Sequence, residues 1–113
     1  MTNLLLLITT ESGKQNAEKV AFKILDKKLA ACVSIKKINS IYRWKSKIEK
    51  NVEFEIVIKS IPSNLDLLIT LLKKELSYEL PQFIYKIFDS EINYFNWVSE
   101  SLNQDVSQEN LQD

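Results

Sequence analysis

The chain has 113 residues, a length typical of one domain and sufficient to bury a core without disulfide bonds or a structural metal. Its 15 basic and 15 acidic side chains give a formal net charge of zero, and the two signs are interspersed, so no phosphate-binding surface is expected. Histidine is absent, which removes the commonest general base and the commonest metal ligand. We therefore expect one domain that does not bind nucleic acid and is not an enzyme.

Glycine and cysteine each occur once. With Gly13 alone, the chain cannot form the glycine-rich loops that bind nucleotide phosphates. Cys32 cannot form an internal disulfide bond, which suits a reducing compartment. The apolar run over residues 4–8 is too short for a secretion signal or a membrane span, and it has no basic flank. These features predict a cytoplasmic protein with no membrane partner.

The first half of the chain predicts a strand, a helix and a hairpin. Residues 3–10 are a short apolar run bounded by polar turn formers, which indicates a buried strand. Apolar residues then recur at helical spacing over residues 17–29, which predicts an amphipathic helix. Residues 31–43 are rich in β-branched and aromatic types, and residues 52–59 alternate between apolar and polar. These two segments predict strands joined by a hairpin around residues 45–47.

The second half predicts another helix, a strand and a terminal helix. Residues 61–64 stop the preceding strand and cap a helix whose apolar positions extend over residues 65–76. A fourth strand is predicted over residues 82–88. A short aromatic helix follows, with Tyr94, Trp97 and Val98 on its buried side. Residues 103–113 are polar and predict a flexible tail.

This order, β-α-β-β-α-β with an extra C-terminal helix, predicts a single α+β domain over residues 1–102. Right-handed crossovers give an antiparallel sheet with two helices on one face, the ferredoxin-like arrangement. The hairpin strands span about 40–45 Å at ~3.3 Å per residue, whereas the first helix spans about 25–28 Å at ~1.5 Å per residue. The long hairpin must therefore extend past the body. It carries Tyr42 and Trp44, whose rings require cover, so self-association is expected.

Five segments resemble, in order and spacing, the landmarks of the CutA family, small trimeric proteins linked to divalent-cation tolerance and structurally similar to PII-like signalling proteins. They are LAACV at 29–33, SIYRWKSKIE at 40–49, IVIKS at 56–60 preceded by Glu53, SYELP at 77–81 and YFNW at 94–97. The match covers nearly all of residues 3–102. The resemblance implies a homotrimer with a binding or regulatory role in metal homeostasis.

Three positions depart from the family pattern. Ser46 replaces a usual glycine at the hairpin, and we expect a longer loop to accommodate it. The turn that usually reads His-Pro-Tyr-Glu is Leu-Ser-Tyr-Glu at residues 76–79. Members proposed to bind copper can carry a further cysteine where this chain has Thr9, so Cys32 is the one candidate metal ligand that remains. We expect Cys32 to be buried as a small hydrophobe, copper to bind poorly, and any divalent cation to bind weakly through carboxylates.

The resemblance implies that the polar residues of the shared segments gather where neighbouring subunits meet. These candidate ligand-binding residues are Glu49, Glu53, Lys59, Tyr78 and Glu79. Two interpretations stay open, a cleft that holds a small anion or cation, or an ion-pair network between subunits. Tyr42, Trp44 and Trp97 are predicted interface residues, because aromatic side chains are enriched in interface cores.

Two other functions compete with this interpretation. A PII-like or ACT-like sensor would bind a small molecule in clefts between subunits, and the resemblance leaves that alternative open. An RNA-recognition domain shares the order of elements but requires stacking rings in the third strand. Residues 52–56 offer only Phe54 between two glutamates, so we reject it.

Overall fold

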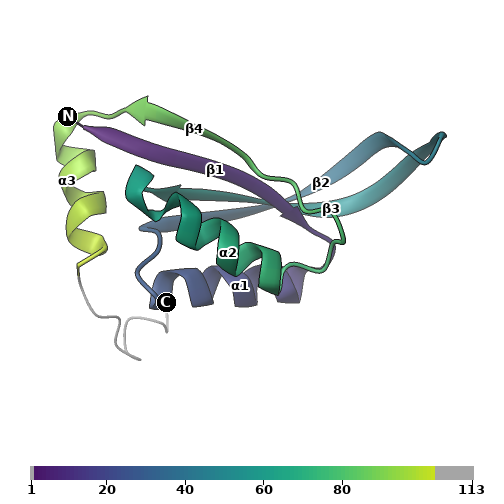
Figure 1. The fold of residues 1–113 in the computed structure, drawn as a ribbon, viewed down its shortest axis with the longest axis horizontal. Coiled ribbons are helices and arrows are strands. Elements are labelled where there is room, and N and C mark those ends of the chain that lie inside the picture. Colours follow the sequence, from purple (N-terminus) through teal and green to yellow (C-terminus); the bar gives the residue numbers. More distant parts are fainter. Residues whose placement is uncertain (1, 104–113) are drawn as a thin grey trace.

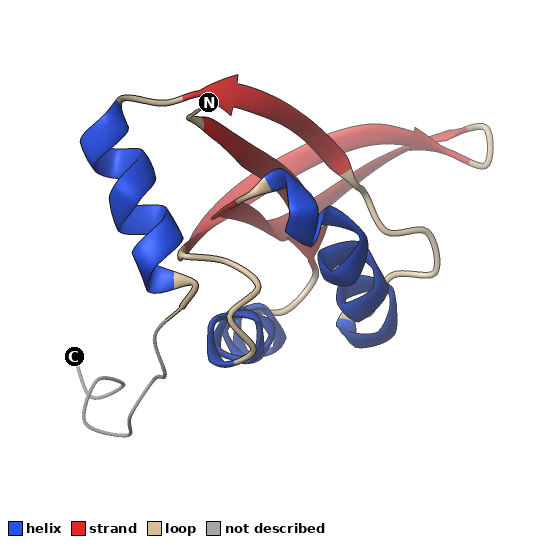
Figure 2. Ribbon diagram, turned by 60° about the vertical axis from the view of Figure 1, so that its left-hand side comes forward, coloured by secondary structure: helices blue, strands red, loops and turns tan. Residues whose placement is uncertain are grey.

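The computed structural model describes residues 2–103 (Figures 1 and 2). Its elements are β1 (Asn3–Glu11), α1 (Lys14–Asp26), β2 (Cys32–Trp44), β3 (Lys47–Ser60), the 3-10 helix η1 (Pro62–Asn64), α2 (Leu65–Glu75), β4 (Ile84–Asp89) and α3 (Ile92–Ser101). The predicted ferredoxin-like order with an extra C-terminal helix is confirmed. The predicted tail, residues 103–113, lies outside the described residues except for Asn103, which is in a turn.

The four strands form one antiparallel sheet in the order β2-β3-β1-β4. Strand β1 occupies an inner position and pairs with β3 on one side and β4 on the other, whereas an edge strand would leave one side of its backbone unpaired. Helices α1 and α2 lie on one face of the sheet (Figure 2). Helix α3 lies across the end of the sheet at which β1 begins and β4 ends (Figure 1).

The core lies between this sheet face and helices α1 and α2. Alternate strand residues point at the helices, and the apolar stripe of each helix points back. The fully buried members include Leu5, Leu7, Ile56 and Ile58 from the sheet and Val20, Ile24, Leu68 and Leu72 from the helices. The apolar positions that the sequence predicts for these strands and helices are therefore the positions that form the core.

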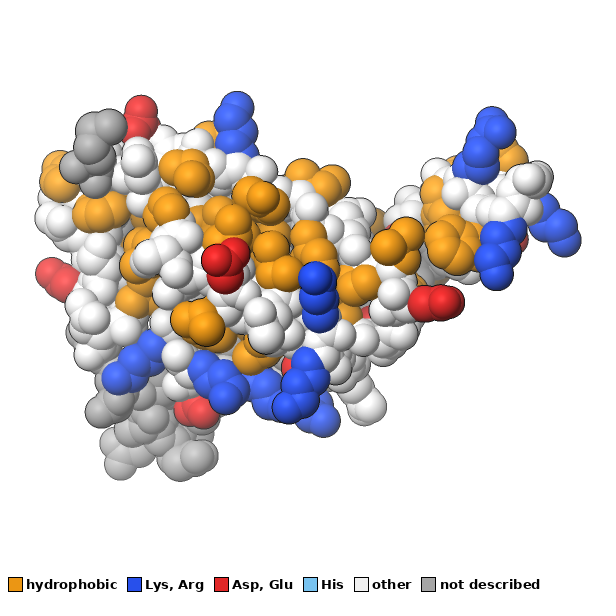
Figure 3. Space-filling view, viewed as in Figure 1, with side chains coloured by type: hydrophobic (Ala, Val, Ile, Leu, Met, Phe, Trp, Pro, Cys, Tyr) orange, Lys and Arg blue, Asp and Glu red, His pale blue; other side chains and the backbone are white. Residues whose placement is uncertain are grey.

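The opposite side of the sheet, here called the open face, is not covered by α1 or α2. It consists of the even-numbered positions of β1, β2 and β4 and the odd-numbered positions of β3, as the strand register requires. Ile8 lies opposite Val57 on one side and Ile84 on the other, which makes an apolar row across the sheet. Ile84 and Phe88 remain 59% and 45% exposed. Figure 3 shows that apolar side chains also gather over the region of α2 and β4 and on the hairpin.

The hairpin of β2 and β3 extends beyond the body as predicted (Figure 1). The prediction of a longer loop at Ser46 is wrong, because Trp44 pairs directly with Lys47 and leaves two residues in the turn. Lys45 has φ 49° and Ser46 has φ 66°, the left-handed pair that a type I′ turn requires. A left-handed residue other than glycine costs roughly 1–2 kcal/mol. The pairing along the full length of β2 offsets this strain.

Two predicted helix boundaries need correction. Helix α1 ends at Asp26, before Leu29, because Lys28 adopts a left-handed conformation with φ 60°. Asn64 does not cap α2 with its side chain. Its amide instead donates to the carbonyl of Leu29 at 3.2 Å and to the hydroxyl of Ser60 at 3.1 Å. These polar side chains fasten the α1–β2 connection to the end of β3.

One carboxylate is fully buried at the end of β1. Glu11 accepts hydrogen bonds from the backbone N–H of Ser12 at 3.0 Å, the backbone N–H of Ser77 at 3.1 Å and the hydroxyl of Ser77 at 2.9 Å. The side-chain amide of Asn16 in α1 also donates to Glu11, and it donates to the carbonyl of Glu75 at 3.1 Å. Glu11 thereby joins β1, α1 and the segment after α2. Sequence analysis missed it because it lies among polar turn formers.

We predict that Glu11→Ala lowers the free energy of unfolding by about 2 kcal/mol, because the substitution removes the shared acceptor of charge-assisted hydrogen bonds. Urea denaturation measures the change. The matched control is Glu18→Ala on the exposed side of α1, which should change stability by no more than about 0.5 kcal/mol. Equal effects of the two substitutions would contradict the structural role of Glu11.

Candidate functional site

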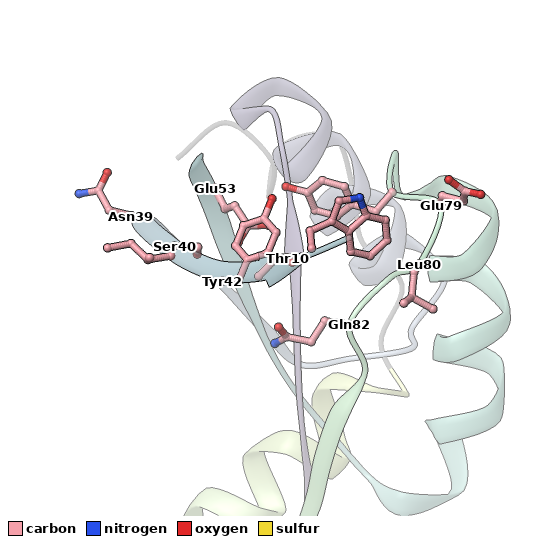
Figure 4. Close-up of a pocket in the computed structure, with 11 residues that line it drawn as sticks. Thr10, Asn39, Ser40, Tyr42, Glu53, Glu79, Leu80 and Gln82 are labelled. Carbon is pink, nitrogen blue, oxygen red and sulfur yellow. The ribbon is translucent and has the colours of Figure 1, made fainter. Parts of the chain in front are cut away.

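A pocket of about 790 Å³ lies at the base of the hairpin (Figure 4). Its walls come from the end of β1, from β2 and β3 where they leave the body, and from the segment after α2. Figure 4 shows Asn39 and Ser40 on one side and Glu79 and Leu80 on the other. The pocket is therefore the space between the hairpin and residues 78–82.

Three of the five candidate ligand residues, Glu53, Tyr78 and Glu79, line this pocket. Glu49 does not line it, although Tyr42, which lies opposite Glu49 on β2, does. Lys59 lies about 20 Å from Glu53 along β3, at ~3.3 Å per residue. Its ammonium group is 6.0 Å from the ring centre of Tyr94 in α3. Within one chain the predicted residues therefore do not form one cluster.

Tyr78 is the residue of this pocket whose ionisation the surroundings change most clearly. Burial raises the pKa of the Tyr78 hydroxyl, and the nearby carboxylate of Glu53 raises the pKa further. The negative charge of Glu11 acts in the same direction. Each of these influences disfavours the phenolate. The phenol is therefore neutral at physiological pH.

The predicted interface residues remain open to solvent in a single chain. Tyr42, Trp44 and Trp97 are 39%, 42% and 47% exposed. Tyr94, predicted on the buried side of α3, packs beside Trp97 with ring centres 5.6 Å apart, but it is 38% exposed. Of the three residues predicted to be buried in that helix, Val98 alone is buried. The interface role of these rings stays a prediction, and their exposure leaves them free to take it.

The described residues do not form a metal site. In the range 2–103, no group of three or more His, Cys, Asp or Glu side chains is placed to hold a metal ion. Cys32 is only half-buried, which corrects the prediction of burial. It lies opposite Lys59 on the open face, whereas Thr9 lies opposite Ile56 in the core. A cysteine at position 9 would therefore point away from Cys32 of the same chain, so these positions do not fit a shared soft-metal site.

The family model described as CutA1 divalent ion tolerance protein matches residues 5–101. The chain belongs to this family. The divalent-cation tolerance protein CutA of Yersinia pestis (strain Pestoides F) is 28% identical over 103 residues, which cover 89% of this chain and 87% of that protein. The similarity to CutA1 relatives therefore extends over almost the whole domain.

Solved structures of CutA proteins give the same result. CutA from Synechococcus elongatus PCC7942 superposes with a TM-score of 0.85 at 34% identity, covering 90% of this chain and 92% of that one. CutA1 from Oryza sativa gives 0.84 at 30% identity, covering 89% and 96%. These relatives are named for CutA or for cation tolerance rather than for a small-molecule sensor. The comparisons therefore favour divalent-cation tolerance over the PII-like alternative.

The comparisons also bear on location. A similar structure, with a TM-score of 0.83 at 29% identity over 88% of this chain and 98% of that one, is named the periplasmic divalent cation tolerance protein CutA from Archaeoglobus fulgidus. Within residues 2–103, none of the helices has both the length and the apolar character that crossing a membrane requires.

The raised pKa of Tyr78 predicts a distinct alkaline titration. In the unfolded chain this phenol ionises near its ordinary value of 10.0, whereas in the fold it ionises at higher pH. The contribution of Tyr78 to the free energy of unfolding is therefore fully present below about pH 10 and is lost as the pH rises through the folded pKa. Ultraviolet absorbance of the folded protein should show a tyrosine that ionises late.

Tyr78→Phe should remove this late step. The control is Tyr85→Phe, which removes a half-exposed phenol on β4. That substitution should leave the late step in place. A late step that survives in Tyr78→Phe would show that another tyrosine is responsible.

Proposed function

We propose that this chain assembles into a homotrimer that acts in divalent-cation tolerance by binding rather than by catalysis. The observation that carries the proposal is the overhanging hairpin, on which Tyr42 and Trp44 stay exposed beside an open sheet face that has an apolar row. Membership of the CutA1 family supports the link to divalent ions. The number of subunits comes from the resemblance to that family.

Burial of the exposed rings would stabilise the assembly. A large aromatic side chain buries about 150–250 Å² when fully covered, and apolar burial contributes about 25 cal/mol per Å². Covering the exposed part of Tyr42, Trp44 and Trp97 would therefore contribute roughly 2 kcal/mol for each ring. Glu49 and Lys59 lie apart within one chain, and in this proposal they take part in contacts between subunits. That arrangement is the ion-pair network, one of the two interpretations that the sequence leaves open.

We also propose a cytoplasmic location. The support is the single free Cys32, which suits a reducing compartment. The periplasm is the alternative, because the Archaeoglobus relative carries that name. Fractionation of the source cells distinguishes the two.

Assembly should depend on the hairpin rings. Trp44→Ala should shift sedimentation equilibrium from trimer toward monomer, because large aromatic side chains frequently dominate interface energies. Phe22→Ala is the control, since Phe22 is also half-exposed but lies on α1, in the helical layer. A monomeric wild-type protein at micromolar concentration would refute the proposed trimer, and equal effects of the two substitutions would refute the role of Trp44.

The link to divalent ions is tested by growth. Expression of this chain in a bacterial strain that lacks its own CutA1 protein should restore growth at an inhibitory concentration of copper(II), zinc(II) or cobalt(II). Trp44→Ala, expressed to the same level, should restore less growth if assembly is required. A folded, expressed wild-type protein that leaves tolerance unchanged would contradict the proposed function.

A further inference from the structure

We draw no further inference here: the strongest candidate, the largely apolar groove between α1 and the outer edge of β2, would take a second copy of the chain, which is already part of the proposed assembly, and nothing in the structure shows any other partner that covers it.

Discussion

Two helices cover only one face of the four-stranded sheet, and most other features of the molecule follow from that constraint. The open face keeps an apolar row through Ile8, Val57 and Ile84, and the β2–β3 hairpin carries further aromatic surface beyond the body. A solitary chain of this size rarely exposes so much apolar area. The same one-sided layering creates the pocket, because the segment after α2 passes from the helical side around to the open side and meets the base of the hairpin.

The core and the pocket are mechanically connected through Glu11. Its buried carboxylate holds the backbone N–H and the hydroxyl of Ser77, and the next residue, Tyr78, forms part of the pocket wall. The family turn usually has proline at this position, and proline has neither group to donate. Ser77 therefore has a structural role in this chain. Without its hydrogen bonds the buried carboxylate of Glu11 would have fewer partners. The wall of the pocket is thereby anchored to β1.

The sequence alone predicted the elements well because hydrophobic periodicity is a local signal that the core uses directly. Ile56 and Ile58 alternate as a strand requires, and Leu68 and Leu72 repeat as a helix requires. The site was predicted less well because it depends on distances between remote segments. The resemblance identified Lys59 and Glu53 together, but the register places them far apart on β3.

The sequence pattern also did not predict the backbone conformation of the hairpin turn or the burial of individual side chains. No pattern indicated that Ser46 would adopt a left-handed conformation in a two-residue turn. The half-buried state of Cys32 depends on which face of the sheet it occupies, and that follows from pairing rather than from residue type. Glu11 looked like a turn former until the packing of β1 against the segment after α2 was known.

The strand order also fixes how the chain can complete its sheet during synthesis. The hairpin of β2 and β3 is local and can form as soon as both strands are made. Strand β1 comes first in the chain, yet it pairs with β3 and β4, and Asn3 meets Asp89 only after nearly the whole domain has been translated. Until then its apolar run lacks one neighbour. The first strand of the domain to be made is thus among the last to be fully paired, and its apolar run is open to aggregation until β4 is made.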